Sequence, residues 1–165
     1  MAVKSIRMLF LFLFLSGVCP AYFAQQISTE IKSLSLGADV IVTGKVSQQT
    51  SSWNKDHTRI YTSATIQVEE YLKGNNSGES VVVRYLGGEV GDIGELYSHM
   101  PRFEDKEEVL VFLKRDNKNA DFKVFNGEDG KIDIVNDTKT GERVTTSNVR
   151  VSALKAQIKT YINQH

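Results

Sequence analysis

A run of strict alternation between residues 60 and 69 constrains the fold of this chain more than any other feature of its sequence. One set of alternate positions carries mainly apolar or small side chains: Ile60, Thr62, Ala64, Ile66 and Val68. The positions between them carry mainly polar side chains: Tyr61, Ser63, Thr65, Gln67 and Glu69. Successive side chains of a β-strand point to opposite faces, so the pattern predicts a strand with one buried face.

Three other segments predict strands that could pair with this one. Residues 38–46 are apolar and β-branched, and Gly44 within them indicates a bulge or a sharp bend. Residues 80–86 contain three consecutive valines. Residues 109–113 are apolar on both faces, which predicts a strand in the centre of the sheet.

The remaining periodic segments complete the predicted fold class. Residues 122–125 and 131–135 flank a turn rich in Gly and Asp, and we expect them to pair as a hairpin. Short helices are expected over residues 28–36 and 153–163, the second capped by Ser152. The apolar stripe of this second helix is Leu154, Ile158, Tyr161 and Ile162. Five or six short strands with a helix at each end predict a mainly β fold, a small barrel rather than a parallel α/β sheet.

Three stretches lack periodicity: residues 48–58, expected to be a loop or a hairpin tip, residues 87–106, expected to be a long loop, and residues 136–148, which are polar and expected to be mobile. The second spans 20 residues, contains four glycines and ends in a Met-Pro-Arg-Phe segment. Loops of that length in a small domain are usually functional or disordered. We expect a barrel domain over residues 25–135, followed by a polar linker and the last helix over residues 136–165.

Residues 1–24 have the pattern of a cleavable secretory signal. Two basic residues precede an apolar run of 11 residues, from Met8 to Val18, which is typical of a signal core and short for a membrane span of about 20 residues. Cleavage is expected after Ala21 or Ala24. An uncleaved anchor helix is one alternative, and a lipoprotein is another, because the residues that end at Cys19 resemble a bacterial lipobox. We therefore expect a secreted or periplasmic protein.

Charge and cysteine content limit the partners and the chemistry. The chain has 20 basic and 20 acidic side chains, and two of the basic ones lie in the signal segment, which leaves a net charge of about −2 on the rest. No nucleic-acid partner is expected from such a balance, and no membrane association is expected after cleavage. The single cysteine, Cys19, lies in or beside the signal, so we expect a mature chain without disulfides or cysteine metal sites.

Four segments resemble the netrin-like family, which includes the tissue inhibitors of metalloproteinases. They read ADVIVTGKV, ATIQVEEYLKGN, SVVVRYLGG and RFEDKEEVLVFLK, and together they cover about half of the mature chain. Uncharacterised exported bacterial proteins with the same Gly-Gly and Pro-Arg-Phe segments resemble the chain more closely still. The positions that match the family pattern are Ala38, Asp39, Gly44, Val46, Val68, Lys73, Gly74, Val111 and Phe112.

The resemblance implies an antiparallel oligonucleotide/oligosaccharide-binding (OB) type barrel of five to six strands and a role in binding other proteins, including proteases. The inhibitors chelate the protease zinc with an N-terminal cysteine that a disulfide holds in place. This chain would start at Tyr22 or Gln25 and has no second cysteine. No inhibitory residue is therefore carried over from the family.

Residues that could support catalysis do not form a recognisable motif. The three histidines are His57, His99 and His165, and none has the spacing of a metal site. Ser98 adjoins His99, but no Gly-x-Ser-x-Gly segment is present. The pairs Glu69-Glu70 and Glu107-Glu108 are expected on solvated strand edges, because neighbouring strand residues point to opposite faces. We expect neither an enzyme nor a cofactor.

The predicted function is that of a non-enzymatic binding module whose partner is another exported protein, with a protease as one candidate. The only tryptophan, Trp53, is either a contact residue or a cover over the barrel end. Met100, Pro101 and Phe103 form an apolar loop tip for which packing across the barrel mouth is favoured. The predicted binding surface comprises Trp53, Gly87, Gly88, Gly91, His99, Met100, Pro101 and Phe103. The alternatives are a glycan- or oligonucleotide-binding barrel and a small metal-dependent hydrolase built around His99.

Overall fold

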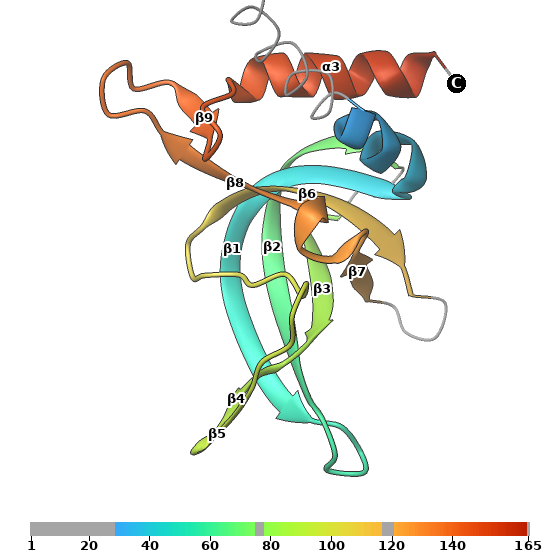
Figure 1. Cartoon of the computed structure of the whole chain (residues 1–165), viewed down its shortest axis with the longest axis vertical. Helices are drawn as coiled ribbons and strands as arrows, with labels where there is room; N and C mark the ends of the chain where they lie inside the picture. The colour runs from blue at the N-terminus through green and yellow to red at the C-terminus, as the bar shows by residue number, and fades with distance from the viewer. Residues whose placement is uncertain (1–28, 75–77, 117–120, 165) are drawn as a thin grey trace, which may run out of the picture. The chain divides into compact units, whose positions relative to one another are not determined.

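The alternating stretch forms the second strand of a closed β-barrel (Figure 1). The computed structural model describes residues 29–74, 78–116 and 121–164. The elements are β1 (Val40–Trp53), β2 (Ile60–Lys73), β3 (Ser80–Leu86), β4 (Gly88–Val90), β5 (Ile93–Glu95), β6 (Glu108–Arg115), β7 (Phe122–Val124), the 3₁₀ helix η1 (Gly127–Gly130), β8 (Lys131–Asn136), β9 (Arg143–Thr145) and α3 (Val151–Asn163). Residues 29–37 form a short helix before β1.

Burial along β2 follows the predicted alternation. The inward residues Ile60, Thr62, Ala64 and Ile66 are buried. Tyr61, Ser63 and Thr65 are half-buried, and Gln67 and Glu69 are exposed. The prediction of one buried face is confirmed.

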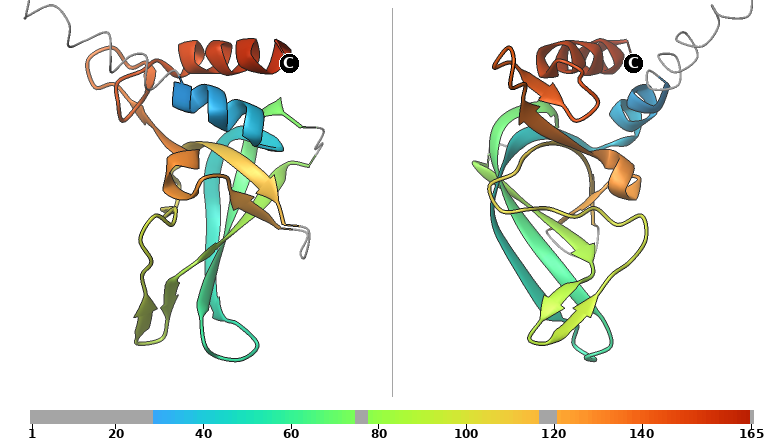
Figure 2. Two further views of the ribbon diagram at one scale, coloured as in Figure 1. Left: turned by 45° about the vertical axis from the view of Figure 1, so that its right-hand side comes forward. Right: turned by 60° about the vertical axis from the view of Figure 1, so that its left-hand side comes forward.

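Five strands close the barrel in the order β1-β2-β3-β7-β6, and β6 pairs back with β1. The right-hand view of Figure 2 shows the strands as a ring. All neighbours are antiparallel except β3 and β7, which are parallel. The predicted mainly β barrel with two short helices is confirmed, and its topology is consistent with the OB type.

The strand at residues 109–113 is central, as predicted. Within β6, Val109, Val111 and Leu113 belong to the apolar core cluster of the barrel, and Leu110 and Phe112 are fully buried on its other face. Because β6 pairs with β1 along one edge and with β7 and β8 along the other, no part of its apolar surface reaches solvent.

The predicted hairpin between residues 122–125 and 131–135 is wrong. Both β7 and β8 pair with β6, residues 113–115 with β7 and residues 108–111 with β8. They form one interrupted strand along β6, and η1 is the insertion between them. Asn126 and Gly127 both adopt φ near +62°, which turns the chain out of the ladder and back into it. The Gly- and Asp-rich segment is therefore a large bulge.

The three stretches without periodicity contain more strand than expected. β1 continues to Trp53, because it pairs with β2 as far as Trp53↔Ile60. Residues 87–106 include the β4–β5 hairpin, and residues 136–148 include β9. The far half of β1 and the β4–β5 hairpin are largely exposed, so their composition is polar, whereas Val144 and Thr145 of β9 are buried but too short a run to show a period. Both β1–β2 and β4–β5 extend from the same end of the barrel, as Figures 1 and 2 show.

The C-terminal helix lies at the other end of the barrel and differs from the prediction at its start. α3 begins at Val151 with Arg150 in the N-cap position, so Ser152 is not the cap. Val151, Leu154 and Ile158 are buried, whereas Tyr161 and Ile162 are half-buried. None of the helices in the described part of the chain is long and apolar enough to cross a membrane.

The Glu69-Glu70 pair, expected to be solvated, is partly exposed and holds α3 and β9 to the barrel, whereas Glu107 of the second pair is largely shielded and bonds Lys131 of β8. Glu70 accepts hydrogen bonds from Lys159 (2.8 Å) and Lys155 (3.0 Å) of α3. Glu69 accepts two 2.7 Å bonds from the guanidinium of Arg143 in β9. These donors lower the pKa of both carboxyls, Lys159 first for Glu70 and Arg143 first for Glu69.

The predicted bulge at Gly44 is confirmed and gives a testable prediction. The β1–β2 register shifts between Thr43 and Gly44, and a Cβ on Gly44 would lie 2.2 Å from the backbone oxygen of Gln67. Gly44→Ala is expected to lower the free energy of unfolding by roughly 1–3 kcal/mol, because the backbone of β2 must move away. Gly94→Ala is the matched control, since its nearest neighbour would be a side-chain carbon at 3.4 Å. Equal denaturation midpoints for both variants would contradict this packing.

The ion pairs of Glu70 predict acid release of α3. A carboxyl with a lowered folded-state pKa stabilises the fold above its usual value of 4.5, and this stability is lost as pH falls through the folded-state pKa. Amide exchange in α3 should therefore accelerate below about pH 4.5 relative to exchange in β6. Glu70→Gln should remove most of this pH dependence, whereas Glu79→Gln, at an exposed site outside these pairs, should retain it. The effect is modest, since partly exposed pairs contribute at most about 1 kcal/mol each.

Candidate functional site

Most of the predicted site residues converge at the end of the barrel from which the two hairpins extend. Trp53, Met100 and Pro101 line a cleft of about 770 Å³ beside the end of β3, which we call the β3 cleft. Gly87 and Gly88 line a second cleft of about 720 Å³, which we call the hairpin cleft. The two clefts share Tyr85, Leu86, Met100 and Pro101. They are therefore adjoining parts of one recessed surface.

Three predicted residues, Gly91, His99 and Phe103, do not line the β3 cleft, although Phe103 borders the hairpin cleft from beneath. Gly91 lies in the tight turn between β4 and β5 with φ +61°, and a Cβ there would meet no atom within 4 Å. Phe103 is only 6% exposed and belongs to the core cluster. Its ring lies 5.6 Å from that of Tyr85, so it supports the floor of the clefts from beneath. Packing of Phe103 into the barrel, the interpretation favoured from sequence, is confirmed.

Trp53 lies at the end of β1 and is half-buried. Its ring stacks on His57 of the β1–β2 turn, with centroids 6.2 Å apart and an interplanar angle of 27°. Asn54 fixes this turn, because its side-chain oxygen accepts bonds from the backbone N–H groups of Thr58 (2.8 Å) and Arg59 (3.1 Å). The indole is thus held on an ordered turn at the rim of the β3 cleft.

Tyr85 forms the shared floor of the two clefts. Its hydroxyl donates to the side-chain oxygen of Gln49 at 3.0 Å, and burial raises its pKa. The tyrosine therefore stays neutral and presents the face and edge of its ring. Sequence analysis missed it, because one tyrosine in a valine-rich strand is indistinguishable from a core residue.

Gly87 and Gly88 allow β4 to lie close over β1 and β2. The hydroxyl of Thr62 donates to the carbonyl of Gly87 at 2.7 Å and contacts the hydroxyl of Ser51 at 2.8 Å. Gly88 adopts φ +131°, and a Cβ there would lie 2.1 Å from the Thr62 hydroxyl. The two glycines are needed for this close approach, and they form the wall of the hairpin cleft.

Glu95 ties the β4–β5 hairpin to the start of β2. Its carboxylate accepts bonds from the backbone N–H of Ile60 and from the Tyr97 hydroxyl, both at 2.9 Å, and the bond from Ile60 is the main cause of its lowered pKa. Arg59 donates to the Tyr97 oxygen at 3.0 Å and lies over the Tyr97 ring at 5.7 Å. These contacts hold Glu95 and Tyr97 in place at the start of the segment that leads to Met100 and Pro101. Ile60 and Glu95 are 35 residues apart and Arg59 and Tyr97 are 38 apart, so no local sequence pattern predicts these two contacts.

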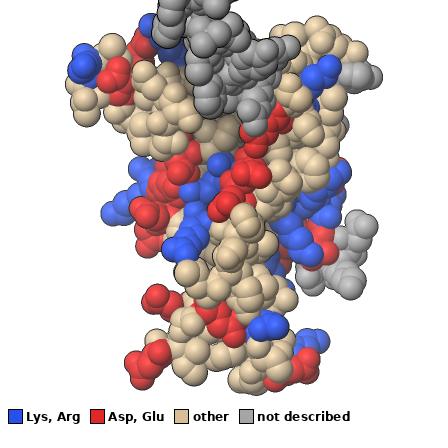
Figure 3. All heavy atoms as spheres, viewed as in Figure 1, with Lys and Arg blue, Asp and Glu red and all other residues tan. Residues whose placement is uncertain are grey.

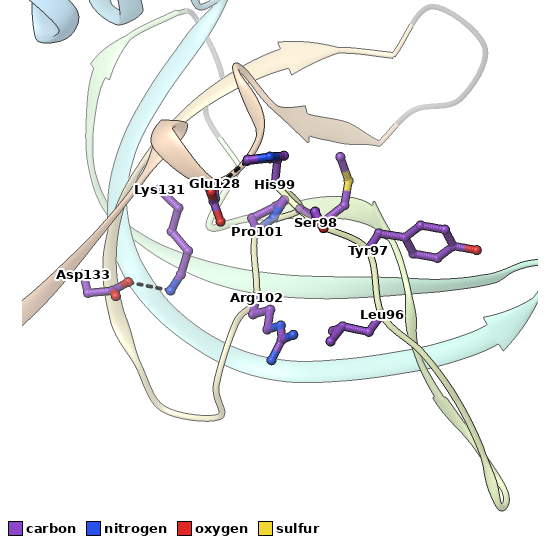
Figure 4. Close-up of a pocket in the computed structure, with 10 residues that line it drawn as sticks. Leu96, Tyr97, Ser98, His99, Pro101, Arg102, Glu128, Lys131 and Asp133 are labelled. Atoms are coloured by element: carbon purple, nitrogen blue, oxygen red, sulfur yellow. Dashed lines mark hydrogen bonds and ion pairs between the residues drawn. The ribbon is translucent and has the colours of Figure 1, made fainter.

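His99 lies in a third, smaller cavity of about 460 Å³, which adjoins the hairpin cleft at Leu96, Tyr97 and Arg102 and is drawn in Figure 4. Its side chain is 85% exposed, and Nδ1 lies 3.1 Å from Glu128 Oε1. In the same cavity Lys131 donates to Glu107 (2.6 Å) and Asp133, and burial raises the pKa of Glu107. The charge of Lys131 is thus matched by two carboxylates, and Arg102 is the other basic side chain that lines this cavity.

The clefts at this end of the barrel are lined by a mixture of apolar, aromatic and charged side chains. Within residues 29–74, 78–116 and 121–164, no three His, Cys, Asp or Glu side chains group as a metal site would require. Acidic and basic side chains are interspersed over the face shown in Figure 3, so no field of one sign is present there. What the clefts offer is aromatic and apolar surface: Trp53, Tyr61, Tyr85, Leu86, Met100 and Pro101.

The chain matches no protein-family model, and no curated protein matches its sequence. Its function must therefore be inferred from the geometry of the described residues.

The hydrogen bond from the Ile60 amide to the Glu95 carboxylate gives a testable prediction. Glu95→Ala removes the acceptor of the Ile60 amide, so exchange of that amide should accelerate and the hairpin cleft should widen. Glu89→Ala, at an exposed site in β4 of the same hairpin, is the matched control and should leave the Ile60 amide unchanged. Equal Ile60 exchange rates in the wild type and both variants would show that the tie does not form in solution.

Proposed function

We propose that this chain is an exported, non-enzymatic binding module that holds another exported protein in the β3 cleft. The observation that carries the proposal is the convergence of Trp53, Tyr85, Met100 and Pro101 from separate parts of the chain on one recessed surface. Aromatic residues and methionine are enriched in the central parts of protein interfaces, where they supply most of the binding energy.

Exposed apolar side chains beside the clefts support a protein partner. Leu96 is 72% exposed and Ile93 is 53% exposed, and both lie on or next to β5. Exposed apolar side chains that lie together beside a cleft are typical of a protein-interaction site. They extend the proposed surface from the hairpin cleft along the β4–β5 hairpin.

Export and inhibition of a protease are the parts of this proposal that rest on sequence alone. Export rests on the signal pattern of residues 1–24, which lie outside the described residues. The protease partner rests on the resemblance to the netrin-like family. N-terminal sequencing of the protein recovered outside the cytoplasm tests the first, and titration of captured proteases with the pure protein tests the second.

A glycan or oligonucleotide ligand is the second candidate, favoured by one contact. The guanidinium of Arg84 lies 4.6 Å from the centre of the Tyr61 ring at the rim of the β3 cleft. Stacked pairs of this kind contribute to single-strand binding in OB barrels. Binding of heparin or single strands that falls steeply with salt would favour this candidate over the protein partner.

Affinity capture with matched variants tests the proposed function. The immobilised protein is exposed to the exported fraction of its source, and retained proteins are identified by mass spectrometry. A partner retained by the wild type and lost when the β3 cleft is altered supports the proposal. A folded bait that retains no protein, or one whose partners are indifferent to the cleft, contradicts it.

Trp53→Ala is the variant predicted to discriminate most clearly. The truncation removes an aromatic wall of the cleft and should weaken partner binding about tenfold or more. Because Trp53 is half-buried on a turn, the free energy of unfolding should change by about 1 kcal/mol or less. Thr50→Ala, at an exposed site in the same strand, is the control and should bind as the wild type. A stability loss of several kcal/mol would instead make Trp53 part of the core.

A further inference from the structure

The two strands that border the β3 cleft separate after a single point of contact. β3 pairs with β2 over its whole length, from Ser80 to Leu86. On its other edge, β3 pairs with β7 only at Val83↔Phe122. Beyond that point Leu86 and Val124 line the cleft from opposite sides. The barrel wall is therefore opened there by a slot between two strand edges.

The backbone of Leu86 points into this slot. Gly87 N–H donates to Ile60 O and Val68 N–H donates to Glu79 O, both at 2.8 Å, so the odd-numbered residues of β3 make the bonds to β2. Residues of an antiparallel ladder alternate between bonding their partner and pointing away from it. The N–H and C=O of Leu86 are therefore directed away from β2, toward β7.

The backbone of Val124 points into the slot from the other side. Phe125 N–H donates to Phe112 O at 2.7 Å, and Asp116 N–H donates to Asp121 O at 3.1 Å. The odd-numbered residues of β7 thus make the bonds to β6, and Val124 directs its N–H and C=O toward β3. Leu86 and Val124 lie beyond the one residue pair that joins β3 to β7, and strand edges that diverge in this way can serve as a template for an added strand.

Each strand edge of the slot carries one basic side chain, Arg84 on β3 and Lys123 on β7, and Asp116, which also lines the cleft, neutralises part of this charge. Arg84 projects from β3 and lies over Tyr61, and among the described residues no carboxylate lies within ion-pair distance of it. Lys123 projects from β7 and pairs with Asp116 at 3.1 Å, with its own side chain 59% exposed. A side chain on the outer face of an added strand would lie between these two cations. An acidic side chain complements them.

The inner face of the slot is apolar. Tyr85 and Val124 border it, and Met100 and Pro101 lie across it. Because side chains alternate along a strand, a segment that places acidic residues outward would place every second residue on this apolar surface. The slot thus favours a peptide segment in which acidic and apolar residues alternate.

We propose that the β3 cleft binds an extended segment of the partner protein by strand addition between β3 and β7, and that it selects alternating acidic and apolar residues. This inference rests on the proposed function and specifies the kind of partner. The acidic side chains pair with Arg84 and Lys123, the apolar ones pack on Met100 and Pro101, and the main chain bonds Leu86 and Val124.

Titration with designed peptides tests the proposal. A peptide of alternating valine and glutamate, added to the isotope-labelled protein, should bind saturably and protect the Leu86 and Val124 amides from exchange. A valine–lysine peptide should bind at least roughly threefold more weakly, the size expected for one exposed charge pair. The valine–glutamate peptide with alternate backbone amides methylated should not bind, because it cannot form the ladder. Equal binding of the two charge forms, no binding of either, or protection confined to other amides would overturn the proposal.

Charge reversal provides the variant test. Arg84→Glu should lower the affinity for the valine–glutamate peptide and raise the affinity for the valine–lysine peptide. Lys123→Glu, on the opposite strand, should change the two affinities in the same directions. Melting curves verify that each variant is folded. The affinity of Arg84→Gln for each peptide should lie between the affinities of the wild type and of Arg84→Glu. A captured partner protein that depends on Trp53 but not on Arg84 or Lys123 would retain the proposed function and overturn strand addition. A partner that depends on neither the tryptophan nor these cations would overturn the proposed function itself.

Discussion

The bend in β1 at Gly44 is the constraint on which the rest of the barrel depends. On one edge β1 pairs with β6 from Val40 to Lys45, and on the other it pairs with β2 from Ile41 to Trp53. A single strand can join both sheets of a closed barrel only if it curves strongly, and a glycine bulge supplies this curvature. The lack of a side chain lets β2 approach to a distance that a Cβ would prevent. Because β1 continues past the bulge, its far half forms the extended hairpin that carries Trp53.

Closure of the barrel also explains why the candidate site lies where it does. The ring is complete at one level, where Val83 pairs with Phe122, and opens toward the hairpin end, where β3 and β7 separate. The β4–β5 hairpin and residues 96–103 return across this opening, fixed by Glu95 and by Phe103 in the core. The apolar surface between the strands is therefore partly covered but not filled, which is the condition for a ligand groove.

The sequence predicted the class of fold well and the individual connections less well. Alternation in β2 and double-sided apolarity in β6 are direct signatures of burial, so both strands were identified correctly. The predicted β7–β8 hairpin was wrong because its turn residues also suit a bulge. The pairing of both strands with β6, which local sequence does not reveal, distinguishes the bulge from the hairpin. For the site, the exposed aromatic and the Met-Pro segment were identifiable from composition. Arg84, Leu86 and Val124 were not, because the edge of a strand becomes free or paired only through the tertiary fold.

The central claim is that backbone groups at the mouth of the barrel are left for a partner. Native-state amide exchange of the free protein tests it most directly, residue by residue. The account predicts slow exchange at Val81, Val83 and Tyr85, which bond to β2, and fast exchange at Leu86 and Val124, which face the slot. Protection of Leu86 and Val124 equal to that of Val83 would mean that the chain itself occupies these groups, and it would contradict the account.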